Sequence, residues 1–353
     1  MTSQMKQLTA VLLSDGKPGH FRCAEGILAA GQRLRSIDAT TVAVRRPRLV
    51  PTDVLAWLTK SRRLAPRAIL RGLYGLDLDD LARPDLIVSA GGDTLAANIA
   101  LARATGAANI FFGSLRRYAP NDFSLALNSY PADRPGGNQV RILKPSPADP
   151  STLPVTDLDP RPLPRVFGLL VGGPSGDARW SERDWSRLFA FLQQTYVELG
   201  LVWIVSNSRR TPANISAQFA ELERLAAGPV RRFVDVRAAG SGTLGELFAE
   251  CGAVAVTADS SAMLSEAIWM RRPVVALRPA NLALPAKEAD YRRWLNGRHL
   301  FRDVELFDIS AQAFVSALGN VIPLPNNPQV ALAEVLAAKL PAVFGASTGG
   351  SPQ

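Results

Sequence analysis

The sequence contains little cysteine, little histidine and no long apolar run. Its two cysteines, Cys23 and Cys251, lie far apart and match no zinc or redox spacing, so we expect a reduced, cytoplasmic setting. The two histidines, His20 and His299, also lie far apart, and nothing in the sequence suggests that they converge, so we expect no metal site. No apolar stretch approaches the roughly 20 residues of a membrane-spanning helix.

Positive charge is what the sequence has in excess. The formal net charge is +9, and most of the excess lies in residues 1–160, which carry 20 Lys and Arg against 14 Asp and Glu. This balance favours an anionic partner, namely nucleic acid, a phosphorylated substrate or an anionic membrane surface. Solubility alone is the alternative explanation. Hydrophobic residues make up 47% of the 353 residues, as in globular proteins, and the length suits two domains.

Short apolar runs alternate with helical patterns along the chain. The first run ends in a charged loop and not in a small-residue cleavage site, which favours a strand over a signal peptide. This strand–loop–helix order predicts parallel sheets covered on both faces. The expected strands are 8–13, 85–90, 109–113, 123–128, 165–171, 201–206, 253–257 and 273–277.

A break in this pattern divides the chain. Seven prolines between 145 and 164 exclude a helix or a central strand there. The fold class that follows is α/β, with two tandem Rossmann-like, doubly wound domains that face a cleft. We expect a helix at about 328–340 to pack back on the first domain. The expected divisions are an N-terminal domain 1–150, a linker 151–164, a C-terminal domain 165–325, and a C-terminal helix and tail 326–353.

The loop "SDGKPGH" follows the first expected strand and leads into a helix. His20 lies at the helix start, where the dipole disfavours the imidazolium, and a neutral imidazole can take a proton from a hydroxyl group. Asp15 is either the rival base or the group that orients His20. Lys17 and Gly19 share this loop, and Lys17 could sense a phosphate. The alternative is a tight turn in which His20 is only a polar cap.

Other loops rich in small and polar residues follow strands, and ligands of open parallel sheets bind at the carboxyl ends of strands. Glycines there let backbone N–H groups approach a phosphate, although a tight turn explains them about as well. The segment "GGPSGDARWS" is neither GxGxxG nor a P-loop. The residues of interest in these loops are Gly91, Gly92 and Asp93 in one, and Gly172, Gly173 and Ser175 in the other.

The segment "TADSSAMLSEA" carries the strongest binding signal. Asp259, Ser260 and Ser261 lie between a buried strand and a helix, where hydroxyls and free N–H groups could hold a diphosphate. Glu266 lies one to two turns into the helix and could accept both hydroxyls of a ribose. A capping box is the structural alternative, but the spacing does not favour it. In "SNSRRTP", Arg209 and Arg210 could neutralise a leaving diphosphate.

The ordered set "SDGKPGH", "GGPSGDARWS", "SNSRRTP" and "TADSSAMLSEA", followed by "RRPVVAL", resembles the mitochondrial-fission ELM family of plant and bacterial proteins. The resemblance runs over most of the chain, and "DGKPGH" and "DSSAMLSEA" are its most specific parts. The sequence departs from the family's pattern at two places, both in the N-terminal half that the resemblance assigns to the acceptor. "GGDT" stands where an Arg-rich "GRRT"-type loop is expected, and Ala132 and Asp133 stand where a His-Asp pair is expected.

That family is in turn similar to GT-B glycosyltransferases and nucleotide-sugar epimerases. The resemblance implies an acceptor-side N-terminal domain and a C-terminal domain that binds the donor, with Glu266 on the ribose and Ser260 and Ser261 on the phosphates. It implies a GT-B-like glycosyltransferase that moves a sugar from a nucleotide-diphosphate donor to a hydroxyl acceptor, lipid-linked or polysaccharide, without a metal or other cofactor. The alternatives are a nucleotide-sugar epimerase and a non-catalytic adaptor of the fission type.

The stretch 45–74 holds eight basic residues and one acid, with apolar residues interleaved. This pattern fits a helical surface on anionic lipid, which would make the protein peripheral on the inner membrane face. A core-packed helix with a solvated basic face fits equally well. We expect no nucleic acid, because no recognised binding motif is present.

Overall fold

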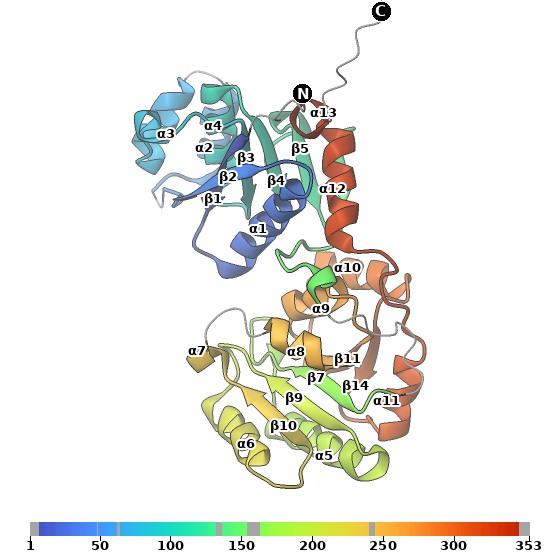
Figure 1. Ribbon diagram of the computed structural model, residues 1–353. Helices are drawn as coiled ribbons and strands as arrows, with labels where there is room; N and C mark the ends of the chain where they lie inside the picture. The colour runs from blue at the N-terminus through green and yellow to red at the C-terminus, as the bar shows by residue number, and fades with distance from the viewer. Residues whose placement is uncertain are drawn as a thin grey trace, which may run out of the picture. The chain divides into compact units, whose positions relative to one another are not determined.

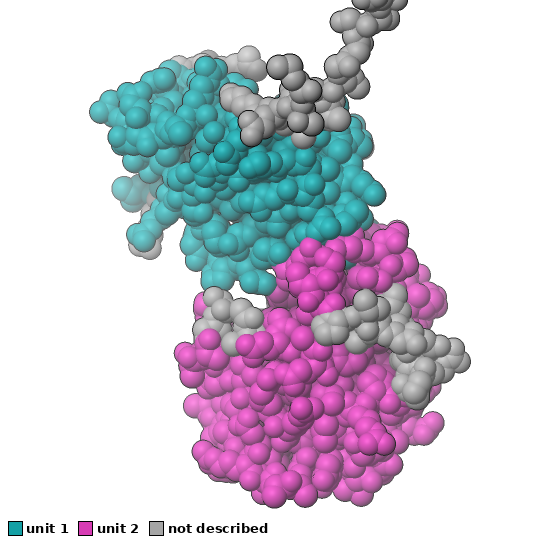
Figure 2. Space-filling model, viewed as in Figure 1, with its two compact units in different colours: residues 1–147, 328–353 teal, residues 148–327 magenta. Residues whose placement is uncertain are grey.

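The computed structural model describes residues 7–47, 49–61, 64–131, 136–153, 163–239 and 244–345. The chain divides into two compact units, which we call unit 1 (1–147 and 328–353) and unit 2 (148–327) (Figure 2). The first boundary therefore lies at 147 and not at 150, and the C-terminal segment is part of unit 1. Residues 154–162 of the expected linker lie outside the described residues.

Unit 1 is built on a six-stranded parallel sheet in the order β2-β1-β3-β4-β5-β6 (Figure 1). The central strand β3 is buried along its whole length, as a parallel strand covered by helices on both faces must be. The strands are β1 Leu8–Ser14, β2 Ile37–Ala43, β3 Leu86–Ala90, β4 Ala108–Phe112, β5 Leu125–Asn128 and β6 Gln139–Arg141.

The helices of unit 1 come from both ends of the chain. Helix α1 begins at Pro18, because the fixed φ of proline suits the first helical position. Helix α12 packs against α1, where Arg33 donates to Gln329 at 2.9 Å, so the prediction for 328–340 is confirmed. The helices are α1 Pro18–Gln32, α2 Thr52–Ser61, α3 Pro66–Tyr74, α4 Leu95–Thr105, α12 Pro328–Lys339 and α13 Pro341–Phe344.

Unit 2 repeats the architecture with a six-stranded parallel sheet in the order β10-β9-β7-β11-β12-β14. Its core is aromatic, and the rings of Phe167, Trp203 and Phe314 lie 5.3 to 5.8 Å apart. The strands are β7 Val166–Leu170, β9 Val202–Ser206, β10 Val230–Val234, β11 Ala253–Thr257, β12 Val274–Arg278 and β14 Arg302–Glu305, with the short pair β8 Ala178–Arg179 and β13 Asn281–Leu282.

Helix α5 shows how local sequence sets the helix bounds of unit 2. Ser181 and Asp184 cap each other's backbone N–H groups at its start, and Gly200 in the left-handed region ends it. The helices are α5 Glu182–Leu199, α6 Ala213–Glu223, α7 Val236–Ala239, α8 Leu244–Glu250, α9 Ser261–Trp269, α10 Ala286–Asn296 and α11 Ala311–Leu318.

Each sheet has one point at which the strand order reverses. In unit 1 the chain winds outward in opposite directions from β1 and β3, and in unit 2 it does so from β7 and β11. Loops that follow such strands diverge and leave a crevice, which is where ligands of doubly wound sheets bind. The loops after these four strands are those that the sequence singled out.

Candidate functional site

A carboxylate and an imidazole meet where β1 ends in unit 1. The side chain of Asp15 is only 2% exposed, and its Oδ2 lies 2.8 Å from Nδ1 of His20 in the first turn of α1. The backbone N–H of Lys17 donates to Oδ1 of Asp15 at 3.1 Å. With its proton on Nδ1, His20 donates to Asp15, and Nε2 can then accept a proton from elsewhere.

Two glycines after β3 make room for side chains from other loops. A Cβ atom on Gly91 would lie 2.1 Å from Nδ1 of His20, and one on Gly92 would lie 2.1 Å from Cζ of Arg116. Gly91 also has a φ of 87°, which favours glycine. Imidazole and guanidinium therefore occupy the space that two Cβ atoms would need.

Positively charged side chains surround the carboxylate of Asp93 in this loop cluster. Nζ of Lys17 donates to its Oδ2 at 2.7 Å, and Nε of Arg46 lies 3.7 Å from its Oδ1. The hydrogen bond from Lys17 holds the pKa of Asp93 below its usual value, with Arg46 and Arg116 contributing, and the same bond raises the pKa of Lys17. The fold thus supplies arginines from other loops where "GGDT" lacks them.

Unit 1 brings together all the residues that the sequence assigned to it, with Gly19 exposed in the first turn of α1. The positions of Ala132 and Asp133 lie outside the described residues. Sequence reasoning missed Arg46 and Arg116. Both follow strands, β2 and β4, so the rule of carboxyl ends could have found them.

In unit 2, the buried carboxylate of Asp259 connects neighbouring loops. Its side chain is fully buried, and Oδ2 accepts from the Gly173 N–H at 2.9 Å and from Nη2 of Arg210 at 2.8 Å. A Cβ atom on Gly172 would lie 2.0 Å from the same oxygen. The side chain of Asp259 therefore ties together the loops after β7, β9 and β11, and the expected donor contact of this residue stays a prediction for its backbone.

The glycine loop after β7 is also turned inward. The N–H of Gly172 donates to Oγ1 of Thr257 at 2.7 Å, and the N–H of Gly173 is used by Asp259. Gly173 has a φ of 153°, and a Cβ there would lie 2.4 Å from the Arg210 carbonyl oxygen. These glycines allow close packing of loops, contrary to the expectation that their amides face a phosphate.

The two predicted arginines have different surroundings: Arg210 is bound within the protein, and Arg209 is exposed. Nη1 of Arg210 donates to the Gly173 carbonyl at 2.6 Å in addition to its ion pair with Asp259. Arg209 is exposed and makes no hydrogen bond or ion pair with any residue that the structure describes. Ser175 lies in a local turn, where its hydroxyl accepts from the Asp177 N–H at 3.3 Å. Of these residues, Arg209 keeps a charge available to a ligand.

Helix α9 begins at the reversal point of unit 2. Ser260 is its N-cap, and its hydroxyl accepts from the Met263 N–H at 3.4 Å; because Met263 stands where a capping box has Glu or Gln, this is a single cap and no capping box. Ser261 is the first helical residue. Glu266 is half-buried and lies one turn beyond the exposed Ala262 on the same face. The N-terminus of α9 therefore combines hydroxyls, a helix dipole and a nearby carboxylate.

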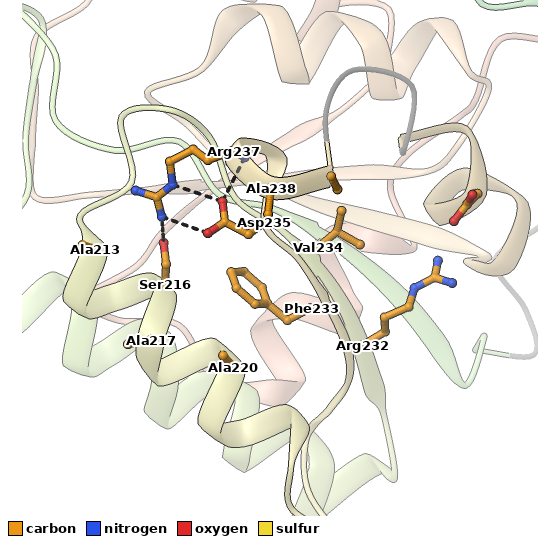
Figure 3. A pocket seen from close by; sticks show the side chains of 12 residues that line it. Ala213, Ser216, Ala217, Ala220, Arg232, Phe233, Val234, Asp235, Arg237 and Ala238 are labelled. Carbon is orange, nitrogen blue, oxygen red and sulfur yellow. Dashed lines mark hydrogen bonds and ion pairs between the residues drawn. The ribbon is translucent and has the colours of Figure 1, made fainter.

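An open groove of about 860 Å³ adjoins these loops at the edge strand β10 (Figure 3). Phe233 and the alanines of α6 line its apolar part, and Asp235 and Arg237 form its polar end. Arg237 also donates to the Ser216 hydroxyl at 2.6 Å. Burial would raise the pKa of Asp235, but hydrogen bonds from Arg237 and Asn207 outweigh it and hold the pKa below its usual value. The sequence did not indicate this groove.

Replacing Asp259 by Ala tests the architectural role of the buried carboxylate. The change leaves the Gly173 N–H and the Arg210 guanidinium without their acceptor, so the free energy of unfolding of unit 2 should fall by about 2–4 kcal/mol. Urea unfolding followed by tryptophan fluorescence reports on unit 2, which holds five of the six tryptophans. Arg209→Ala is the control and should not change stability. An unchanged urea midpoint for Asp259→Ala would contradict the assignment.

Known proteins resemble this chain in sequence and in fold. The family model for mitochondrial fission ELM1 matches residues 141–336. MurG of Acinetobacter baumannii is 14% identical, with a TM-score of 0.50 over 92% of this chain and 98% of that chain. The UDP-GlcNAc 2-epimerase of Neisseria meningitidis, solved with UDP-GlcNAc, is 11% identical, with a TM-score of 0.51 over 96% and 100%. No curated protein matches in sequence.

A protein of Listeria monocytogenes described as a UDP-N-acetylglucosamine 2-epimerase gives a TM-score of 0.56 at 12% identity, over 94% of this chain and 96% of that chain. At these identities the likeness concerns the fold, which is the GT-B arrangement of two Rossmann-like domains. The family match spans more than half of the residues and includes the loops after β7, β9 and β11. The chain therefore belongs to the mitochondrial fission ELM1 family.

Proposed function

We propose that the protein is a glycosyltransferase that moves a sugar from a nucleotide-diphosphate donor to a hydroxyl acceptor. The observation that carries this proposal is the pair of Asp15 and His20 at the reversal point of unit 1. A buried carboxylate that holds Nδ1 of an exposed imidazole is the arrangement of an oriented general base.

In the proposed reaction, Nε2 of His20 takes the proton of the acceptor hydroxyl while its oxygen attacks the anomeric carbon of the donor sugar. The bond from that carbon to the diphosphate oxygen breaks, and the nucleoside diphosphate leaves with the electron pair. Asp15 keeps the imidazole oriented and stabilises the imidazolium that forms. The proton then passes from His20 to solvent.

We assign the donor to unit 2. Ser260, Ser261 and the N-terminus of α9 would hold the diphosphate, and Arg209 would neutralise the charge that develops on it. These groups supply the positive potential that a departing diphosphate requires, so we propose turnover without a divalent cation. Glu266 would accept the two ribose hydroxyls. The support is their place beside the reversal of the sheet, together with structural neighbours solved with UDP and UDP-GlcNAc.

We further propose that the segment 49–64 of unit 1 binds an anionic membrane. The structure buries Leu55 in the core but leaves Leu49, Trp57 and Leu64 at 96%, 52% and 40% exposure. The segment 45–74 that contains it carries eight basic residues and one acid. No helix among the described residues is long and apolar enough to cross a bilayer. Apolar contacts with basic residues around them suit a surface attachment.

The two histidines give a matched test of the base. His20→Asn should lower turnover by about 10²–10⁴-fold and leave nucleotide affinity unchanged, because a general base acts on the transition state. His299→Asn is the control, since His299 has a φ of 58°, which asparagine tolerates. Equal turnover of the two variants would contradict the assignment. Sugar isomerisation without any acceptor would identify an epimerase instead.

Glu266→Ala tests the donor site separately. Loss of a charged acceptor for the ribose should weaken nucleotide binding by about 1–3 kcal/mol, measured by calorimetry or by thermal stabilisation. Glu221→Ala, on the exposed face of α6, should leave it unchanged. Equal affinity of the two folded variants would argue against the donor site.

Vesicle binding tests the membrane surface. The protein should sediment with anionic vesicles, stay free with neutral ones and be released as salt rises. Trp57→Ala should weaken vesicle binding by roughly tenfold, because it removes an aromatic side chain that membrane binding would bury. Phe307→Ala, which removes an aromatic side chain 45% exposed in unit 2, should bind as the wild type. Equal recovery with both vesicle types would overturn the proposal.

A further inference from the structure

Arg116 differs from Lys17 and Arg46, the other cations near Asp93 in unit 1. Lys17 and Arg46 face Asp93, whereas Arg116 makes no hydrogen bond or ion pair with any described residue. Asp15 does not account for the position of Arg116, because His20 already binds that carboxylate. Arg116 acts on Asp93 only by longer-range attraction. A guanidinium carries five N–H donors, and because Arg116 is exposed and bonds to no described residue, it keeps donors for a ligand.

The backbone holds Arg116 where it is at a conformational cost. Its φ is 52°, in the left-handed region that residues other than glycine seldom adopt. Its guanidinium lies against Gly92, where a Cβ atom would come within 2.4 Å of both Nε and Nη2. Unusual backbone conformations of this kind persist where the surroundings impose them, often at functional sites.

The place of Arg116 relative to the proposed base decides what it would bind. Arg116 and His20 pack against Gly92 and Gly91, whose Cα atoms are about 3.8 Å apart across a trans peptide. Helices α1 and α4 both begin at this loop cluster, and their N-termini add positive potential. An anionic group at Arg116 would therefore lie close to a hydroxyl at His20.

We propose that Arg116 binds a phosphate group of the acceptor and so places the acceptor hydroxyl at His20. The planar guanidinium can donate two parallel hydrogen bonds to two phosphate oxygens, which an ammonium group cannot do. The inference rests on the proposed function, because it names the chemistry of the acceptor for the same site. A soluble phosphorylated sugar and a lipid phosphate share this chemistry.

Neighbouring Arg117 is a matched control, because it is also exposed but pairs with Asp53 at 2.9 Å. Phenylglyoxal labels accessible arginines, and peptide mass spectrometry resolves the two positions. Inorganic pyrophosphate should slow the labelling of Arg116 by about tenfold and leave that of Arg117 unchanged. Vesicles with phosphatidic acid, compared with phosphatidylcholine vesicles, form the lipid arm, and protection by them alone would identify a lipid phosphate.

Equal protection of Arg116 and Arg117, or no protection by either probe, would overturn the inference. A second measurement uses Arg116→Asn, since asparagine keeps the left-handed backbone and removes the charge. This variant should raise KM for a phosphorylated acceptor at least tenfold with little change in kcat, and Arg117→Asn should not. The labelling needs no donor. An unchanged nucleotide affinity of Glu266→Ala, which would argue against the donor site, and a lack of protection at Arg116 are therefore separate results.

Discussion

A carboxylate removed from water must be paired, and this requirement organises both sites. Asp15 follows a strand at the reversal point of unit 1, and Asp259 follows one in unit 2; both side chains are almost completely buried. Because an unpaired buried charge is very costly, each is paired: Asp15 with groups of its own loop and the first turn of α1, and Asp259 with loops that are distant in sequence. The glycines beside them follow from the same need, since a Cβ atom would fill the space of the paired groups.

The two pairs differ in what the carboxylate holds. Asp259 binds a guanidinium that stays charged at any accessible pH, and its other contacts are within loops, so it fixes the shape of unit 2. Asp15 binds an imidazole that is 42% exposed and can change its protonation state. The need to pair a buried carboxylate therefore gives Asp259 a structural role in unit 2 and makes the imidazole held by Asp15 a candidate base in unit 1.

The sequence predicts the central elements well because burial on both faces makes them apolar. The strands on either side of both reversal points, β1, β3, β7 and β11, were found. The four edge strands β2, β6, β10 and β14 were missed, because they are only partly buried and, as "IDATTVA" and "VRRFV" show, carry no continuous apolar run. An edge strand is specified by its one neighbour, which composition does not show.

For the site, the sequence identified the loops but not the direction of their polar groups. Spacing alone does not show that the amides of Gly172 and Gly173 are used internally, because that depends on how β7 pairs with β11. Nor does it show that Arg46 and Arg116 reach the loop after β3. Local motifs thus indicate where a doubly wound sheet binds ligands. The partners of each buried charge, which only the fold supplies, decide which of these residues remain available to a ligand.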